Sequence, residues 1–367
     1  MRILISGAGM AGLSAGINLG NAGHDVAIVE RAQHLRVNGS PIDIRGESLA
    51  VAQQMGVLDE IRARQVDMTA RSCFVDGNGD EMADLPLAEI NDTADDTEIP
   101  REDLAHALLK ALGPSVPLTF GESVAELLDD GRGVDVLFTS GERARYDLVV
   151  GADGLHSATR RLIFGPEHQY LRHLGFYTAL ANLPQYHAAG APNPIYNFPG
   201  HLAGIVTYRD VAMAVLTFRS SWIDYDYHDL DAQKRILVAE FGGHDRWRVP
   251  ELLDAACRDP ELYFDSVSQI DMPSWHRGRV VLVGDAAHCA SPMSGRGTSL
   301  AITGTWLLAK ALTENVDDLD AALAQYERDQ RPHVAYAQGT AGAGGDLLVP
   351  ATQEAIDGRN RELARAG

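Results

Sequence analysis

The sequence Gly7-Ala8-Gly9-Met10-Ala11-Gly12 lies between a short apolar run, 3–5, and a pattern typical of a helix, 13–19. A second apolar run, 26–29, follows and ends at Glu30. This order predicts a strand, a tight glycine turn, a helix and a second strand. It is the βαβ unit that binds dinucleotides in many proteins.

Each glycine of the turn has its own physical role. Gly7 permits the turn, Gly9 lets the backbone approach a pyrophosphate, and Gly12 lets the helix pack closely on the sheet. The phosphates would lie at the helix N-terminus beside Ala11, where free N–H groups and the positive end of the helix dipole point outward. Glu30 stands where a carboxylate binds the adenosine ribose. This unit alone does not separate NAD from FAD.

Composition excludes several classes of protein. With 367 residues, the chain is long enough for two domains or one large one. A net charge of −20 with scattered lysines and arginines argues against nucleic-acid binding, and no apolar run is long enough to predict a membrane span. The cysteines Cys73, Cys257 and Cys289 are far apart, so we expect buried thiols, no metal site and a cytoplasmic protein.

The pattern of apolar residues changes along the chain. Buried-strand patterns at both ends enclose a region, about 171–272, of alternating aromatic-rich runs that indicate an antiparallel sheet. We expect an exposed acidic loop over 91–98, and a helix end or loop at the glycine cluster 342–345. The predicted helices are 48–64, 103–112, 231–241, 249–258 and 298–312, and the predicted strands are 69–81 (two, around a turn at 76–79), 123–128, 134–139, 146–150, 175–181, 195–198, 202–208, 211–219 and 279–283.

Two further motifs share one pattern, an apolar strand followed by glycine and aspartate. In 149–160 and in 281–297 an apolar strand ends in Gly-Ala-Asp or Gly-Asp, which places Asp153 and Asp285 at the carboxyl edge of the predicted sheet. Ligands bind at that edge in such folds. In the second motif, Gly295 and Gly297 open another helix whose N-terminus could face a negative charge.

With these three motifs in order, the chain resembles the class A FAD-dependent aromatic monooxygenases, and most closely the small tetracycline-inactivating type. The resemblance implies an α/β fold: a Rossmann-like FAD-binding domain (doubly wound parallel sheet) with an inserted antiparallel-sheet substrate domain and C-terminal helices. The expected division is FAD-binding domain at 1–68, 100–170 and 273–340, substrate domain at 69–99 and 171–272, and a helical segment at 341–367.

The resemblance also implies roles for individual residues. Non-covalent FAD would contact the turn and the sheet edge, and Asp153-Gly154 with Arg160 would support both FAD and NAD(P)H. His288 is expected to belong to the loop fold rather than to act in catalysis. The implied FAD-binding residues are Gly7, Gly9, Ala11, Gly12, Glu30, Arg31, Asp43, Arg101, Asp153, Asp285, Gly295, Gly297 and Thr298.

The Arg-x-x-Gly-x-x-x-Asp run from Arg36 to Asp43 has the spacing of the NADPH-contacting arginine and flavin-contacting aspartate in these relatives. Arg36 is therefore a candidate for NAD(P)H, and Arg45 is a further candidate at the nicotinamide side, with a surface charge as the alternative for each. The chain departs from the family pattern at Arg296, Ser299 and Gly304, where glutamine, asparagine and aspartate are usual.

The implied reaction is hydroxylation by FAD, NAD(P)H and O2 through a flavin C4a-hydroperoxide, so no side chain is expected to act as a nucleophile. Leu180 and Met213 replace polar residues of the tetracycline-inactivating relatives, which favours an aromatic or apolar polycyclic small-molecule substrate. Core packing is the alternative role for each candidate substrate residue. These candidates are Tyr177, Tyr196, Phe198, Tyr208, Met213 and Phe218.

Other functions remain to be separated. A flavin-dependent halogenase would need a Trp-x-Trp-x-Ile-Pro stretch, which the sequence lacks, and a flavin-free dehydrogenase would not need the motifs at Asp153 and Asp285. A flavoprotein that dehydrogenates, or that holds a product without oxygenating it, stays open because of the departures at 296, 299 and 304. The chain is expected to act as a monomer or homodimer.

Overall fold

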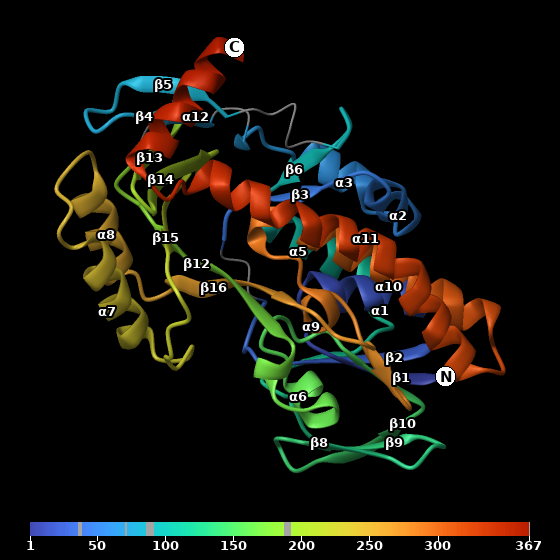
Figure 1. The fold of residues 1–367 in the computed structure, drawn as a ribbon. Helices are drawn as coiled ribbons and strands as arrows, with labels where there is room; N and C mark the ends of the chain where they lie inside the picture. Colours follow the sequence, from blue (N-terminus) through green and yellow to red (C-terminus); the bar gives the residue numbers. More distant parts are fainter. Residues whose placement is uncertain (36–38, 70–71, 86–91, 187–191, 367) are drawn as a thin grey trace.

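A six-stranded sheet, parallel except at its edge strand β17, forms the first layer of the molecule (Figure 1). The computed structural model describes residues 1–35, 39–69, 72–85, 92–186 and 192–366. The strand order is β17 (His276–Arg277), β18 (Val280–Leu282), β11 (Leu148–Gly151), β1 (Arg2–Ser6), β2 (Asp25–Glu30) and β7 (Leu118–Phe120).

The two faces of this sheet are covered differently because successive side chains of a strand point to opposite faces. Ile3 and Ile5 of β1 pack among helices, whereas Leu4 packs against a small antiparallel sheet. The helices on the first face are α1 (Met10–Asn21), α5 (Arg101–Leu112) and α10 (Gly297–Glu314). The small sheet has the order β10 (Arg143–Tyr146), β9 (Val134–Phe138) and β8 (Val124–Asp129). A parallel sheet with crossover helices agrees with the fold class expected from the sequence.

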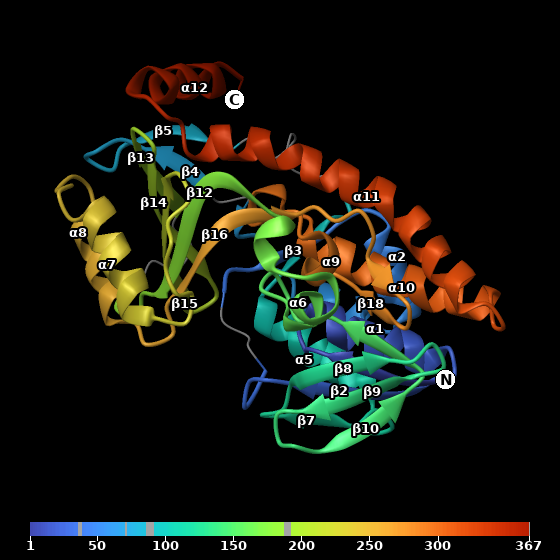
Figure 2. The same ribbon diagram turned by 60° about the horizontal axis from the view of Figure 1, so that its bottom comes forward.

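A second, seven-stranded sheet stands beside the first layer (Figures 1 and 2). Its neighbours are antiparallel except for the parallel pair β13 and β4. Helices α7 (Leu230–Phe241) and α8 (Val249–Arg258) cover the face that is turned away from the first layer. The strand order is β16 (Tyr263–Ile270), β12 (Leu171–Asn182), β15 (Val211–Arg219), β14 (His201–Tyr208), β13 (Asn193–Phe198), β4 (Ser72–Val75) and β5 (Glu81–Asp84).

Short elements connect the two layers. The link between them includes β3 (Ile42–Ile44), which pairs antiparallel with β6 (Thr97–Ile99).

The remaining elements are α2 (Ser48–Gln54), α3 (Leu58–Ala63), α6 (Ala158–Phe164), η2 (Glu167–Gln169), α9 (Asp285–His288), η3 (Pro292–Ser294), α11 (Leu319–Leu348) and α12 (Gln353–Ala366). Among the described residues, no helix is long and apolar enough to cross a membrane.

Three sequence predictions are corrected. The helix expected over 48–64 is two helices, α2 and α3, because the chain turns at Gly56 with φ +74°. The expected acidic loop 91–98 ends in strand β6, where Thr97 is buried. The single strand expected over 146–150 is the end of β10 and the start of β11, which belong to different sheets.

The glycine cluster 342–345 lies near the C-terminal end of helix α11, which ends at Leu348, so the helix end is confirmed and the loop is not. Helix α11 runs from the first layer to the seven-stranded sheet, so its glycines meet other elements (Figure 2). A methyl group built on Gly344 would lie 2.6 Å from the carbonyl oxygen of Met293, and one on Gly345 would lie 2.8 Å from the ring of Phe176. The glycines therefore permit close packing of the helix.

This packing predicts opposite effects for two neighbouring substitutions. Gly344→Ala should lower the free energy of unfolding by about 1–3 kcal/mol, because the Met293 backbone must shift. Gly342 is exposed and a methyl group there meets nothing within 4 Å, so Gly342→Ala should gain about 0.5–1 kcal/mol of helix stability. Urea unfolding of both variants checks this, and equal effects would contradict the close contact at Gly344.

Candidate functional site

The glycine turn after β1 meets the ends of two other strands at one point. Gly7 has φ +107°, and a methyl group on it would lie 2.5 Å from the carbonyl oxygen of Ala152. A methyl group on Gly12 would lie 1.9 Å from the carbonyl oxygen of Gly7. Gly284, with φ +58°, approaches Ala11 so closely that a methyl group would lie 2.7 Å from the alanine Cβ. These contacts leave room only for hydrogen at the three glycines.

Gly9 differs from these glycines because a methyl group on it would meet nothing within 4 Å. It is the N-cap of α1 and has no side chain to cap the helix, so the first N–H groups of α1 point into open space. That space, in front of a positive helix end, fits a pyrophosphate. The turn therefore has the shape that FAD binding requires.

Glu30 lies at the end of β2 and already has partners in the chain. Its two carboxylate oxygens accept hydrogen bonds from the N–H groups of Ala8 and Ala32, each at 2.8 Å. The carboxylate thus holds the glycine turn beside the end of β2, where an adenosine ribose would reach it. Arg31, the next residue, is exposed.

Asp153 and Asp285 differ in the surroundings of their carboxylates. Asp153 accepts hydrogen bonds from Ser157 and from the N–H of Thr159, at 2.8 Å, so it organises the start of α6. Asp285 keeps accessible surface although protein encloses it, and burial raises its pKa, against the opposing effect of Arg101. A side chain that is both enclosed and accessible borders interior space, which fits a hydroxyl-rich ligand chain at Asp285.

Asp43 and Arg45 form an ion pair at 2.9 Å in front of the loop that opens α10. Arg45 is 5% exposed, so the surface-charge alternative is wrong for it. Burial raises the pKa of Asp43, and Arg45 counteracts this effect. A methyl group on Gly295, which has φ +61°, would lie 3.4 Å from the Arg45 guanidinium. Gly297 and Thr298 begin α10 beside this pair.

The departures from the family pattern have structural partners. Ser299 accepts a hydrogen bond from the backbone N–H of Arg45 at 2.9 Å, which ties α10 to the Asp43 segment. Arg296 pairs with Asp92, and its guanidinium lies 4.9 Å from the Tyr336 ring centre. At Gly304 a larger side chain would meet Gln330. Arg36 lies outside the described residues.

Comparisons with known proteins agree with this geometry. The family described as "FAD binding domain" matches residues 1–176 and 266–339. The chain belongs to this FAD-binding family. A flavin-dependent monooxygenase of an unknown prokaryotic organism is 34% identical over 342 residues, covering 91% of this chain and 86% of the relative. An uncharacterized protein of Mycobacterium tuberculosis is 38% identical over 332 residues, 89% of each chain.

The structure of the tetracycline destructase Tet(51) is also similar. It superimposes with a TM-score of 0.85 at 30% identity, covering all of this chain and 96% of that one. Together these findings identify a flavoprotein of the aromatic-hydroxylase type of FAD-dependent monooxygenase, as the sequence motifs predict.

The candidate substrate residues of the sequence analysis divide between the two faces of the seven-stranded sheet. Four of the six belong to the core that packs against α7 and α8, on the face turned away from the FAD-binding layer. For these four, the expected substrate contact is corrected to core packing, because strand alternation sends them to that face. They are Tyr177, Tyr196, Phe198 and Phe218.

Met213 and Tyr208 lie on the other face, which is turned toward the FAD-binding layer. Met213 is opposite Asn182 of β12, and Leu180 shares that face two residues earlier. Tyr208 ends β14, where burial raises its pKa and Glu102 of α5 adds to the effect. Leu180 and Met213 are apolar members of this face, which also carries Asn182.

Tyr263, the first residue of β16, is not among the substrate residues predicted from the sequence. It lies opposite Leu180 on the same face and keeps 42% of its surface accessible. Burial nevertheless raises its pKa, as does the charge of Asp265, while Arg101 lowers it. Like Asp285, Tyr263 is both enclosed and accessible, so it borders interior space near the FAD-binding residues. Its place on an edge strand with few apolar neighbours gave no sequence signal.

His288 and the cysteines have no place in this site. His288 is 1% exposed with its ring 4.6 Å from that of Trp275, and burial lowers its pKa to about 3, which fits the expected structural role. Cys73 and Cys289 are buried as predicted, whereas Cys257 is partly exposed on α8.

The open space at Gly9 allows a test that separates folding from FAD binding. Gly9→Val should leave the unfolding temperature of the apoprotein unchanged, because the new side chain meets no protein atoms. It should fill the pyrophosphate space and raise the FAD dissociation constant at least about tenfold, or ~1.4 kcal/mol. Flavin fluorescence during titration of the apoprotein measures this constant. An unchanged dissociation constant would mean that the phosphates bind elsewhere. Gly243→Val is the control, because a methyl group on Gly243 also meets nothing within 4 Å.

Proposed function

We propose that this protein is an NAD(P)H-dependent FAD monooxygenase that hydroxylates an aromatic or apolar polycyclic small molecule. The overall reaction consumes the substrate, O2, NAD(P)H and a proton, and forms the hydroxylated product, water and NAD(P)+. The observation that supports it best is that Asp285, among the FAD-binding residues, and Tyr263, on the sheet face that carries Leu180, are both enclosed by protein and yet keep accessible surface.

FAD would supply the electron transfer and oxygen activation, and the chain would bind and orient both reactants. The α1 N-terminus would hold the pyrophosphate, Glu30 the ribose, and Asp285 with Arg101 the flavin side chain. The Asp43–Arg45 pair, which lies beside Gly295, would help to hold the flavin ring. The N-terminus of α10 favours negative charge on a reduced ring by roughly 0.3–1 kcal/mol.

The substrate would lie on the face formed by Leu180, Met213 and Tyr263. Leu180 and Met213 offer no hydrogen bond, whereas the Tyr263 hydroxyl can orient one polar group of a ligand. This chemistry favours a flat, mainly apolar molecule over a densely hydroxylated polycycle. The name of Tet(51) gives tetracycline as its substrate class. We expect this protein not to accept tetracycline, so a substrate screen should include it as the negative control.

The remaining expectations are part of the same proposal. We place the FAD-binding domain at 1–68, 100–170 and 273–340 and the substrate domain at 69–99 and 171–272, although β6 at the end of 69–99 pairs with β3. NAD(P)H would bind at the surface of the FAD-binding domain through Arg36. The enzyme would act in the cytoplasm as a monomer or homodimer.

An isotope experiment tests the reaction type. A screen of phenols, fused aromatic hydrocarbons and tetracycline, followed by NADPH loss, should give acceleration with an aromatic compound and none with tetracycline. The product should carry one oxygen atom from 18O2, detected by mass spectrometry, and none from H2-18O. A dehydrogenated product, or label from water, would contradict oxygenation while leaving FAD binding intact.

Two arginines of the connecting segment should differ in effect. Arg36→Ala should slow anaerobic reduction of the flavin by NADPH and leave FAD content unchanged, because we assign Arg36 to NADPH. Arg45→Ala should instead lower FAD content, because it leaves Asp43, whose side chain is only 22% exposed, without the cation 2.9 Å away. Stopped-flow absorbance and FAD released by acid measure the two effects. A normal reduction rate in Arg36→Ala would make it a surface charge.

A further inference from the structure

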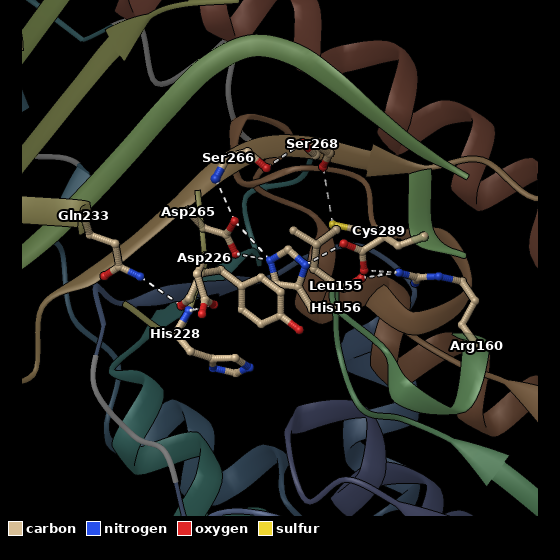
Figure 3. Close-up of polar contacts among 12 residues, drawn as sticks. Leu155, His156, Arg160, Asp226, His228, Gln233, Asp265, Ser266, Ser268 and Cys289 are labelled. Carbon is tan, nitrogen blue, oxygen red and sulfur yellow. Dashed lines mark hydrogen bonds and ion pairs between the residues drawn. The ribbon is translucent and has the colours of Figure 1, made fainter. Parts of the chain in front are cut away.

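A row of alternating charges joins the FAD-binding layer to the edge strand β16 (Figure 3). Arg160 donates to the carbonyl of Ala286 at 2.9 Å and to Glu167 at 2.8 Å. The other oxygen of Glu167 lies 2.8 Å from Nδ1 of His156, and Nε2 of His156 lies 3.2 Å from Asp265. We call Arg160, Glu167, His156 and Asp265 the charge row.

The charge row is largely shielded from water. The side chain of Arg160 has no exposed surface, and those of His156, Glu167 and Asp265 are between 14% and 20% exposed. The ring of Tyr227 stacks on His156 with 4.1 Å between ring centres and 7° between planes. Such shielding strengthens each ion pair relative to one on the surface.

The geometry requires a protonated His156. Both of its ring nitrogens face carboxylates, which accept hydrogen bonds and cannot donate them when ionised, so both nitrogens must carry hydrogen. Burial by itself lowers the pKa of His156, but hydrogen bonds and charges from Asp265 and Glu167 outweigh this and raise it to about 9. The other cation beside it, Arg161, donates to the carbonyl oxygen of His156 at 2.8 Å.

The two ends of the charge row meet the two halves of the site. Ala286 follows Asp285 in the short helix α9, and Asp285 is assigned to the flavin side chain. Asp265 stands two residues after Tyr263, on the same face of β16, opposite Thr178. The ion pair between His156 and Asp265 therefore holds the substrate-facing side of β16 against the FAD-binding loop.

We propose that His156 is a positioning residue that, by joining Glu167 to Asp265, holds the substrate sheet closed over the flavin. This inference rests on the proposed function because it takes FAD to bind at Asp285. Asp265 has no second cation in the charge row, so loss of His156 leaves a shielded carboxylate without its cation. The edge of the sheet at β16 would then move away from the FAD-binding layer, and Tyr263 with it.

The test compares His156→Gln with His276→Gln. His276 is a matched control because it also pairs with a carboxylate, Glu327 at 3.3 Å, and is 22% exposed. With FAD bound, acrylamide should quench flavin fluorescence more strongly in His156→Gln than in the wild type, and equally in His276→Gln. Unchanged quenching in His156→Gln would overturn the proposal.

A pH series supplies the second readout. The folded-state pKa of His156, about 9, lies above its ordinary value of 6.5, so its stabilisation is complete below about pH 6.5 and is lost as the pH rises through 9. The unfolding midpoint of His156→Gln should lie roughly 2–4 °C below that of the wild type at pH 6.5, and the difference should vanish above pH 9.

A double-mutant cycle with Asp265→Asn separates a link between layers from a local role. In the proposal the two substitutions are not additive, in quenching or in the unfolding midpoint, because each removes the same ion pair. Additive effects would mean that His156 acts only through Glu167 within its own layer, and would overturn the inference. Neither readout needs NADPH, O2 or a substrate. A failure of the oxygen-label experiment therefore bears on the proposed function alone.

Discussion

The structure depends on the close approach of three strand ends at the N-terminus of α1. The turn at Gly7 contacts Ala152 after β11, Gly12 contacts Gly7 itself, and Gly284 after β18 contacts Ala11. Any larger side chain at these glycines would separate the sheet from α1. Because they meet, the ends of β11 and β18 bring Asp153 and Asp285 to the glycine turn after β1, and Glu30 at the end of β2 accepts a hydrogen bond from that turn. This arrangement suits a long extended cofactor.

The second sheet acquires its function from its orientation. Alternate residues of each strand pack against α7 and α8, while the others face the FAD-binding layer. Several aromatic residues, including Tyr177 and Phe218, pack in the core against α7 and α8, and the face toward the FAD-binding layer carries aliphatic side chains such as Leu180 beside Tyr263. The core stabilises the sheet, and the opposite face is left to select the substrate.

Polar contacts complete the site between the two layers, beside apolar contacts such as that of Ile270 in β16 with the core of the first layer. Asp43 pairs with Arg45 beside the flavin loop, and His156 pairs with Asp265 at the sheet edge. Enclosed ion pairs contribute little net stability compared with apolar packing, but breaking one is costly and each allows only one geometry. This property suits a site in which a flavin and a substrate must be held in a fixed relation.

The sequence by itself determined the glycine turn, the order of strands and helices around Gly7 and the family of the chain, because these follow from contacts between residues near in sequence or from motif spacing. Only the tertiary structure decided which face each strand residue takes, since a shift of one residue exchanges the faces. For the same reason Tyr177 was assigned to the substrate. The burial of Arg45 and the link from His156 to Asp265 join distant segments, and no local pattern encodes such contacts.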